Sequence, residues 1–295
     1  MTTKDRVPPF PSGEAHAVSS YVRVRLDIAY DGAGFAGWAF QPGQRTVAGE
    51  LRTALGRLFA DPRQLTVAGR TDAGVHATGQ VAHVDVLPEE WDRHAGSLLW
   101  RLRGILPEDV KVTAAAVVPG EFNARFSALS RRYEYRISDA VWGVSPLRRH
   151  DVVAWPRSLD AGAMNEAAAV LLGEHDFAAF CRRREGATTI RQLQRVQWRR
   201  DPDGLLEATV VADAFCHSMV RSIVGAMAAV GEGRRDTKWL KGLLRQDLRS
   251  GEVTVAPAHG LTLVEVMYPD DPAQWSSRQE LTRRIRILEA EPNQT

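Results

Sequence analysis

A nine-residue run near the start of the chain alternates between bulky apolar side chains and charged or small ones. Its bulky apolar members are Val22, Val24, Leu26, Ile28 and Tyr30. A period of two predicts a strand with one buried face and one exposed face. Because strands of this kind are typical of antiparallel sheets, the run argues against a fold built on a buried parallel sheet.

Similar alternation recurs along the chain, and segments with apolar residues at helical spacing are interspersed with it. We expect further strands at 80–86, 112–118, 131–137, 191–198, 205–215 and 260–268. We expect helices at 47–60, 159–173, 217–231 and 237–248. The pattern predicts an α+β fold with a largely antiparallel mixed sheet, helices on one face of the sheet and a central cleft.

The elements divide into two similar halves, 21–118 and 119–270, each with several strands and one long helix. Residues 1–20 are rich in Pro and Ser, and we expect a disordered tail there. Residues 271–295 form a polar C-terminal extension in which a helix is expected. A paired architecture with the cleft between the halves follows from this division.

Cys181 and Cys216 are the only cysteines, and their spacing fits neither a CxxC motif nor a zinc site. We therefore expect two free core thiols in a reducing compartment. No apolar run reaches the roughly 18 residues of a membrane helix, and the first 20 residues lack the apolar core of a signal peptide. These features predict a cytoplasmic protein with no membrane association.

The formal net charge is +2, but the positive charge is concentrated in residues 181–200, which hold a single acidic residue. The arginines of this run are Arg182, Arg183, Arg184, Arg191, Arg195, Arg199 and Arg200. Such a run is either a solvated surface or a face that binds a polyanion. The use of arginine, whose planar guanidinium matches phosphate oxygens, favours the second interpretation.

Residues 31–37 read DGAGFAG and contain a formal GxGxxG directly after the first expected strand. In a dinucleotide-binding unit, a helix would open at the third glycine. Trp38, Pro42 and Gly43 follow instead, so no helix can begin before about Val47. We interpret this segment as a glycine-rich connection.

Asp72 lies in the run Gly69-Arg70-Thr71-Asp72-Ala73-Gly74, just before an expected strand. A metal site with His76 and His83 would need a helical turn that the glycines disfavour, so we expect no metal. A catalytic carboxylate on a glycine-flanked loop is a second possibility, since glycine lets the backbone approach a ligand. Spacing alone leaves a structural turn equally open.

Five blocks in order resemble the tRNA pseudouridine synthase A (TruA) family. They are GRTDAGVHATGQVAH (69–83), YDGAGFAGW (30–38), FNARFSALSRRYEY (122–135), HSMVRSIVG (217–225) and GLTLVEVMYPD (260–270). Together they span about residues 21–270. The resemblance implies an isomerase that needs no cofactor and converts uridine to pseudouridine at positions 38, 39 and 40 of the tRNA anticodon stem-loop.

The resemblance also implies roles for individual residues. Asp72 aligns with the catalytic aspartate of the family, and attack on C1′, attack on C6 and removal of a ribose proton all remain open to it. Tyr133 aligns with the active-site tyrosine, Arg221 with the arginine that pairs with the aspartate, and Arg70 with the arginine of the loop. Leu261 and Leu263 are expected to line the floor of the pocket.

The resemblance further implies a homodimer with tRNA bound in a central cleft. We expect the arginines of 181–200, together with Arg131, Arg132 and Arg136, to form the positive groove. Two other classes remain: an RNA-binding protein without the chemistry, and a pseudouridine synthase that acts on a different RNA.

Overall fold

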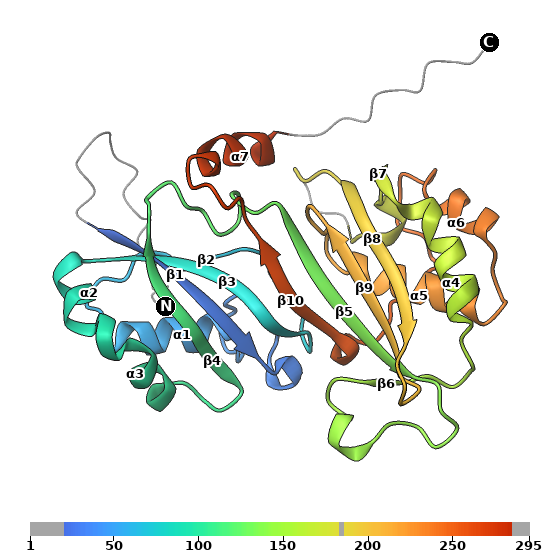
Figure 1. Ribbon diagram of the computed structural model, residues 1–295, viewed down its shortest axis with the longest axis horizontal. Helices are drawn as coiled ribbons and strands as arrows, with labels where there is room; N and C mark the ends of the chain where they lie inside the picture. The colour runs from blue at the N-terminus through green and yellow to red at the C-terminus, as the bar shows by residue number, and fades with distance from the viewer. Residues whose placement is uncertain (1–20, 183–185, 285–295) are drawn as a thin grey trace, which may run out of the picture.

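The protein is described by a computed structural model that covers residues 21–182 and 186–284 (Figure 1). The expected N-terminal tail at 1–20, the end of the C-terminal extension and the arginines at 183 and 184 lie outside the described residues. Within the described part, no helix is both long and apolar enough to cross a membrane.

The strands of the described residues form one sheet in the order β4-β1-β3-β10-β5-β9-β8-β7, with β2 beside β3 and β6 beside β5. All the pairs are antiparallel except β3 with β10 and β5 with β6. The strands are β1 (Val22–Tyr30), β2 (Thr66–Val67), β3 (His76–Val86), β4 (Val110–Val118), β5 (Ser130–Ser138), β6 (Val153–Ala154), β7 (Gly173–Asp176), β8 (Ile190–Arg200), β9 (Leu206–Ala212) and β10 (Leu261–Met267). The predicted fold class, a mixed protein with a large and mostly antiparallel sheet, is confirmed.

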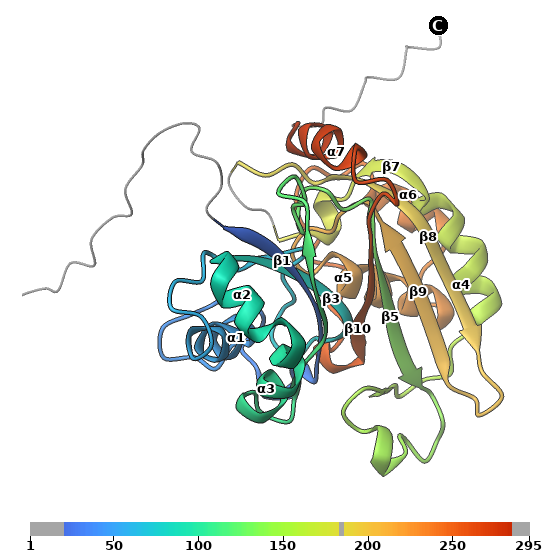
Figure 2. The same cartoon turned by 60° about the vertical axis from the view of Figure 1, so that its left-hand side comes forward.

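Helices lie at both ends of this sheet, except α7 (Gln274–Arg283), which lies near the end of β10 in Figure 1. The others are α1 (Val47–Gly56), α2 (Pro88–His94), α3 (Leu98–Ile105), α4 (Ala161–Ala168), α5 (Met219–Gly231) and α6 (Thr237–Leu243). Figures 1 and 2 both show α1, α2 and α3 beside β1 and β4, and α4, α5 and α6 beside β8 and β9. The expected helices at 47–60, 159–173, 217–231 and 237–248 are confirmed with shorter bounds, whereas α2 and α3 were not predicted.

The core follows from the alternation that the sequence shows. Leu26 and Ile28 of β1 are fully buried, and so are Tyr135 and Ile137 of β5. In β5 the intervening residues are partly exposed, as expected for a strand with two different faces. Residues opposite each other on neighbouring strands share a face, so the apolar side of β5 continues onto β9 and β10.

The strand β10 comes from the C-terminal part of the chain but lies in the middle of the sheet. It runs parallel to β3, with Thr262 opposite His76, and antiparallel to β5, with Leu263 opposite Tyr133. The β2–β3 loop that carries Asp72 and the strand that carries Tyr133 therefore lie on either side of β10 (Figure 1).

Candidate active site

The carboxylate of Asp72 lies at the beginning of α5. His217 Nε2 is 3.1 Å from Oδ1 of Asp72, the hydroxyl of Ser218 donates to Oδ2 at 3.3 Å, and Nη1 of Arg221 is 3.7 Å from Oδ2. The side chain of Asp72 is 22% exposed. Three contacts thus come from one short segment, 217–221, and the carboxylate remains partly exposed to solvent.

Arg221 is held in place by the backbone next to it. Its Nε donates to the carbonyl of Ala256 at 2.6 Å, and the N–H of Ala256 donates to the carbonyl of Arg221 at 3.1 Å. Every other residue of α5 is buried. Arg221 is therefore the one partly exposed position of this helix, and its guanidinium places a positive charge beside the carboxylate of Asp72.

The glycine-rich segment 31–38 supports the loop of Asp72. A Cβ on Gly32 would lie 2.0 Å from the carbonyl oxygen of Val75, so only glycine fits this approach. Gly37 has a φ of +95°, and a Cβ there would lie 2.9 Å from the carbonyl oxygen of Thr71. The N–H of Trp38 donates to that same oxygen at 3.1 Å. The formal GxGxxG is thus a glycine-rich connection, as interpreted from the sequence, and its backbone packs against the Asp72 loop.

A buried polar network fixes the loop from the other side. The hydroxyls of Tyr30 and Thr71 lie 2.8 Å apart, and Gln80 donates to the carbonyl of Gly69 at 2.8 Å and to Tyr30 at 3.2 Å. Burial raises the pKa of Tyr30 to about 12, so its hydroxyl keeps its proton at neutral pH. The residues on both sides of Arg70 are therefore anchored while Arg70 itself is exposed.

Tyr133 lies on β5 with its side chain 7% exposed, and its ring meets that of Phe215 edge to face at a centroid distance of 5.1 Å. Burial, followed by the nearby Tyr30, raises the pKa of Tyr133 well above its usual range. Leu263, opposite Tyr133 on β10, is fully buried, and Leu261 is 5% exposed. Both leucines are packed beneath the site like other core residues.

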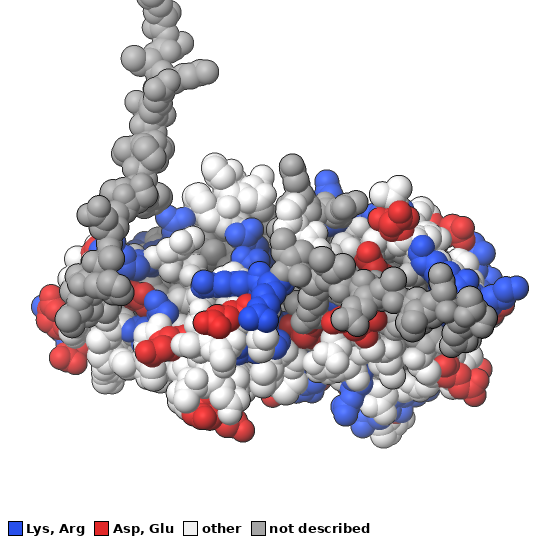
Figure 3. All heavy atoms as spheres, turned by 90° about the horizontal axis from the view of Figure 1, so that it is seen from above, with Lys and Arg blue, Asp and Glu red and all other residues white. Residues whose placement is uncertain are grey.

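Among the described residues, the arginines of the expected positive groove do not all lie on one face of the sheet. Arg131 is 6% exposed, and its guanidinium donates to the carbonyls of Ala68, Arg125 and Asp213. It was wrong to assign this side chain to a phosphate-binding surface, because its donors are committed inside the protein. In Figure 3 the face seen from above carries side chains of both signs, with Lys and Arg side chains gathered near its middle.

The other arginines of the expected groove divide between two faces. Arg132 and Arg136 alternate with Tyr133 and point to the opposite side of β5, where they pair with Glu134, Glu207 and Glu265. Arg195 and Arg199 of β8 are exposed on that same opposite side, since the alternate residues Val196 and Trp198 are buried. Arg182 is exposed, and its N–H donates to the carbonyl of His217 at 3.1 Å, so its backbone lies next to the site.

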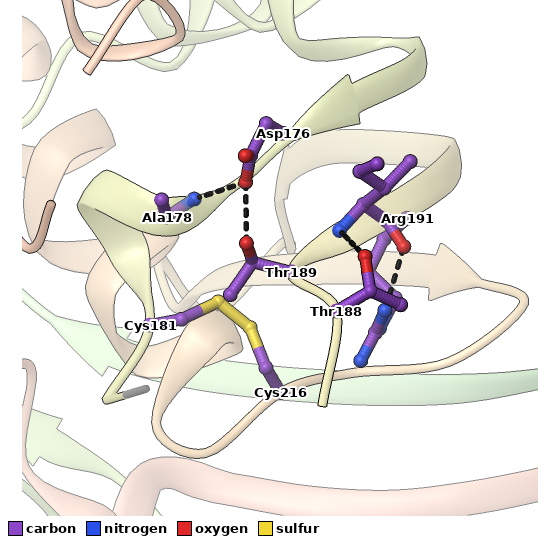
Figure 4. The surroundings of a disulfide bond; sticks show 8 residues. Asp176, Ala178, Cys181, Thr188, Thr189, Arg191 and Cys216 are labelled. Atoms are coloured by element: carbon purple, nitrogen blue, oxygen red, sulfur yellow. Dashed lines mark hydrogen bonds between the residues drawn. A yellow bond between two sulfur atoms is a disulfide. The ribbon is translucent and has the colours of Figure 1, made fainter. Parts of the chain in front are cut away.

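Cys181 and Cys216 form a disulfide, with their Cα atoms 5.7 Å apart (Figure 4). The prediction of two free thiols was wrong, because residues 35 positions apart in the sequence meet where the segment after β9 passes the one after β7. Figure 4 shows the disulfide beside Thr188 and Thr189, and Thr189 donates to Asp176. Cys216 lies between Phe215 and His217, so the bond tethers the segment that contacts both Tyr133 and Asp72.

The two histidines considered with Asp72 as metal ligands have other partners. Nδ1 of His76 accepts from the N–H of Gly32, and Nε2 lies 2.8 Å from the carbonyl of His150. His83 accepts from the N–H of Ala124, and burial lowers its pKa to about 4. Among the described residues, no group of three or more His, Cys, Asp or Glu side chains is arranged to hold a metal ion.

Sequence reasoning missed His217 and Ser218, whose side chains make shorter polar contacts with Asp72 than Arg221 does. Both lie in the block HSMVRSIVG, whose arginine was singled out. The available signal was their place at the expected start of a helix, four and three residues before Arg221. Nothing in the sequence shows that a helix start faces a loop 146 residues away.

Comparison with known proteins agrees with the resemblance. Residues 167–269 match the model of a family described as tRNA pseudouridine synthase. The tRNA pseudouridine synthase A of Frankia casuarinae is 60% identical over 267 residues, which cover 90% of this chain and 96% of that one. Those of Streptomyces griseus and Mycobacterium leprae are 54% and 52% identical, over 92% and 91% of this chain and 96% and 97% of theirs. This chain belongs to the tRNA pseudouridine synthase A family.

Proposed function

We propose that this protein isomerises uridine to pseudouridine in tRNA, at positions 38, 39 and 40 of the anticodon stem-loop, with Asp72 as its catalytic carboxylate. The observation that carries the proposal is the convergence of His217, Ser218 and Arg221 on one accessible carboxylate. It is supported by relatives of this chain that are named tRNA pseudouridine synthase A.

The reaction breaks the bond between N1 of uracil and C1′ of the ribose and forms a bond between C5 and C1′. The uracil turns between the two steps, C5 loses a proton and N1 gains one. The atoms and electrons of product and substrate are the same, so the reaction consumes no co-substrate. The reaction needs a group that reacts with the ribose or the base, a surface that holds the base, and a group that transfers the proton.

In this proposal Tyr133 provides the surface for the base. Its ring is held against Phe215 and has the fully buried Leu263 beside it. Because burial raises the pKa of Tyr133, its hydroxyl acts in protonated form, as a hydrogen-bond partner of the turning base. An aromatic surface of this kind offsets part of the stacking energy lost when the base leaves its stem.

Arg70 and Arg182 provide the contacts with phosphate. Both are exposed, Arg70 on the loop of Asp72 and Arg182 beside the backbone of His217. Folded RNA is recognised chiefly by shape and phosphate contacts, and two arginines flanking the carboxylate suit that recognition. We further propose a cytoplasmic homodimer whose cleft holds the tRNA, and sedimentation of the purified protein tests its oligomeric state.

The function is tested by mapping pseudouridine in unmodified tRNA transcripts incubated with the purified protein. We compare the wild type with Asp72→Asn and with Asp203→Asn, which makes the same change at an exposed residue of the β8–β9 turn. We expect pseudouridine at positions 38 to 40 with the wild type and with Asp203→Asn. Asp72→Asn is expected to bind tRNA but to lose at least about 10²-fold in turnover.

Two outcomes would contradict the proposal. Unchanged turnover of Asp72→Asn would remove this residue from the mechanism. A folded wild type that binds tRNA without forming pseudouridine would point to a binding protein, and activity on other RNA alone would point to a different substrate.

A further inference from the structure

Ser218, the residue just before α5, has a left-handed backbone. Its φ is 65° and its ψ is 5°, and it is the only residue other than glycine with a positive φ among those that the structure describes. A side chain with a Cβ is strained in this region, and residues that keep such a conformation are concentrated at functional sites. The left-handed backbone of Ser218 therefore lowers the stability of the fold, and a function of this residue would explain why the conformation is kept.

The beginnings of other helices show what Ser218 gives up. Thr46, Asp160 and Asp236 precede α1, α4 and α6 with an extended backbone, and each side chain accepts a hydrogen bond from an N–H of its helix. Serine is as good a cap as these residues. Ser218 nevertheless makes no such bond, and its hydroxyl donates to Oδ2 of Asp72 instead.

The left-handed residue also explains why two consecutive side chains reach the same carboxylate. In an extended strand, neighbouring side chains point to opposite sides, and in a helix they diverge by about 100°. Here His217 contacts Oδ1 of Asp72 while Ser218 contacts Oδ2. The turn at Ser218 brings both side chains to one side of the backbone, so that the carboxylate is held at both oxygens.

We propose that His217 and Ser218 are positioning residues for Asp72, and that the left-handed backbone of Ser218 is kept for catalysis at the expense of stability. The proposal rests on the proposed function, since it needs Asp72 to act on the substrate. It assigns to the start of α5 a second task besides presenting Arg221, namely to fix the direction of the carboxylate.

The test is a pair of serine-to-glycine substitutions at the beginnings of two helices. Ser218→Gly keeps the left-handed backbone without strain and removes the hydroxyl. Ser97→Gly makes the same change before α3, where φ is −128° and the hydroxyl forms hydrogen bonds with the carbonyl of His94 and with Arg101. The melting temperature, kcat and KM for a tRNA transcript are measured for both variants and for the wild type.

Ser218→Gly is expected to raise the melting temperature and to lower kcat roughly 10-fold, with KM unchanged. Ser97→Gly is expected to leave kcat unchanged without raising the melting temperature. His217→Gln, which cannot reproduce the ring geometry, is expected to lower kcat with KM unchanged. An opposite movement of stability and kcat at position 218 distinguishes positioning from a merely structural role.

A Ser218→Gly protein with the kcat of the wild type, or with a lower melting temperature, would overturn the proposal and leave the proposed function intact. If His217→Gln had the kcat of the wild type, His217 would not be a positioning residue for Asp72. A wild type that forms no pseudouridine in any transcript would overturn the proposed function and, with it, this inference.

Discussion

The two faces of β5 use the same types of residue in opposite ways. On one face, Arg131 and Tyr135 are buried, and their polar atoms bond to backbone carbonyls. On the other face, Arg132, Glu134 and Arg136 are partly exposed and pair with one another or with neighbouring carboxylates. An arginine on the first face organises the protein, whereas an arginine on the second mainly balances charge. The role of a charged residue thus depends on its place in the alternation.

The largest expected difference is between neighbouring arginines. Arg131→Met removes the donor from two buried carbonyls and one part-buried carbonyl, and we expect the free energy of unfolding to fall by about 3 kcal/mol or more. Arg132→Met removes only half-exposed ion pairs, and we expect a loss below about 1 kcal/mol. Urea unfolding of both variants measures the contrast, and equal losses would show that the two faces do not differ in this way.

The next contrast lies within the buried face. The hydroxyl of Tyr135 donates to the carbonyl of Pro257 at 2.9 Å, so Tyr135→Phe is expected to cost about 1 kcal/mol of stability and to spare turnover. Tyr133→Phe is expected to change stability by less than about 0.5 kcal/mol and to lower turnover about 10-fold. Parallel unfolding and pseudouridine assays test this pair. If Tyr133→Phe kept full turnover, its hydroxyl would have no part in the reaction.

The smallest expected effect is the loss of stability in acid that comes from Asp151, a partner of Arg136 on the charged face. Burial raises the pKa of Asp151, but Arg148 and Arg136 outweigh it and bring that pKa below its ordinary value of 3.8. Because the folded pKa lies below the unfolded one, this stabilisation is present above pH 3.8 and is lost as the pH falls through the folded value. Asp151→Asn is expected to flatten the acid limb of the stability profile, as measured by urea midpoints down to a pH of about 3. Asp203→Asn should leave the loss of stability in acid unchanged. If both variants changed it equally, Asp151 would not be its source.

Much of the fold could be predicted because alternation and helical spacing are local properties. The strands β1, β5 and β10 and the helix α5 were expected near their observed bounds. The short helices α2 and α3 have only about two turns each, too few for a periodic pattern to stand out. The pairing of β10 with β3 joins residues far apart in the chain, so no local pattern announces it.

The residues of the candidate site were proposed from the resemblance, whereas their geometry comes only from the structure. Motif resemblance pointed to Asp72, Tyr133, Arg70, Leu263 and Arg221, and the structure brings Arg221 to within 3.7 Å of Asp72. The alternation of β5 already puts Arg131 on the side of Tyr133, and this could have excluded it from an exposed groove. The left-handed backbone of Ser218 and the meeting of Cys181 with Cys216 depend on tertiary contacts, which the sequence does not display.

Because β10 is central in the sheet but late in the sequence, the sheet and the candidate site are completed late in synthesis on the ribosome. Both neighbours of β10 in the sheet are made long before residue 261. Until then most of the edge that each presents to β10 has no partner, since β2 and β6 cover only two residues of it each. The strand then joins segments whose contact spans most of the chain, a slow kind of closure. The loop of Asp72 and the ring of Tyr133 can take up their fixed separation only when it is inserted. A nascent chain therefore carries both groups without an assembled site until β10 (Leu261–Met267) has emerged.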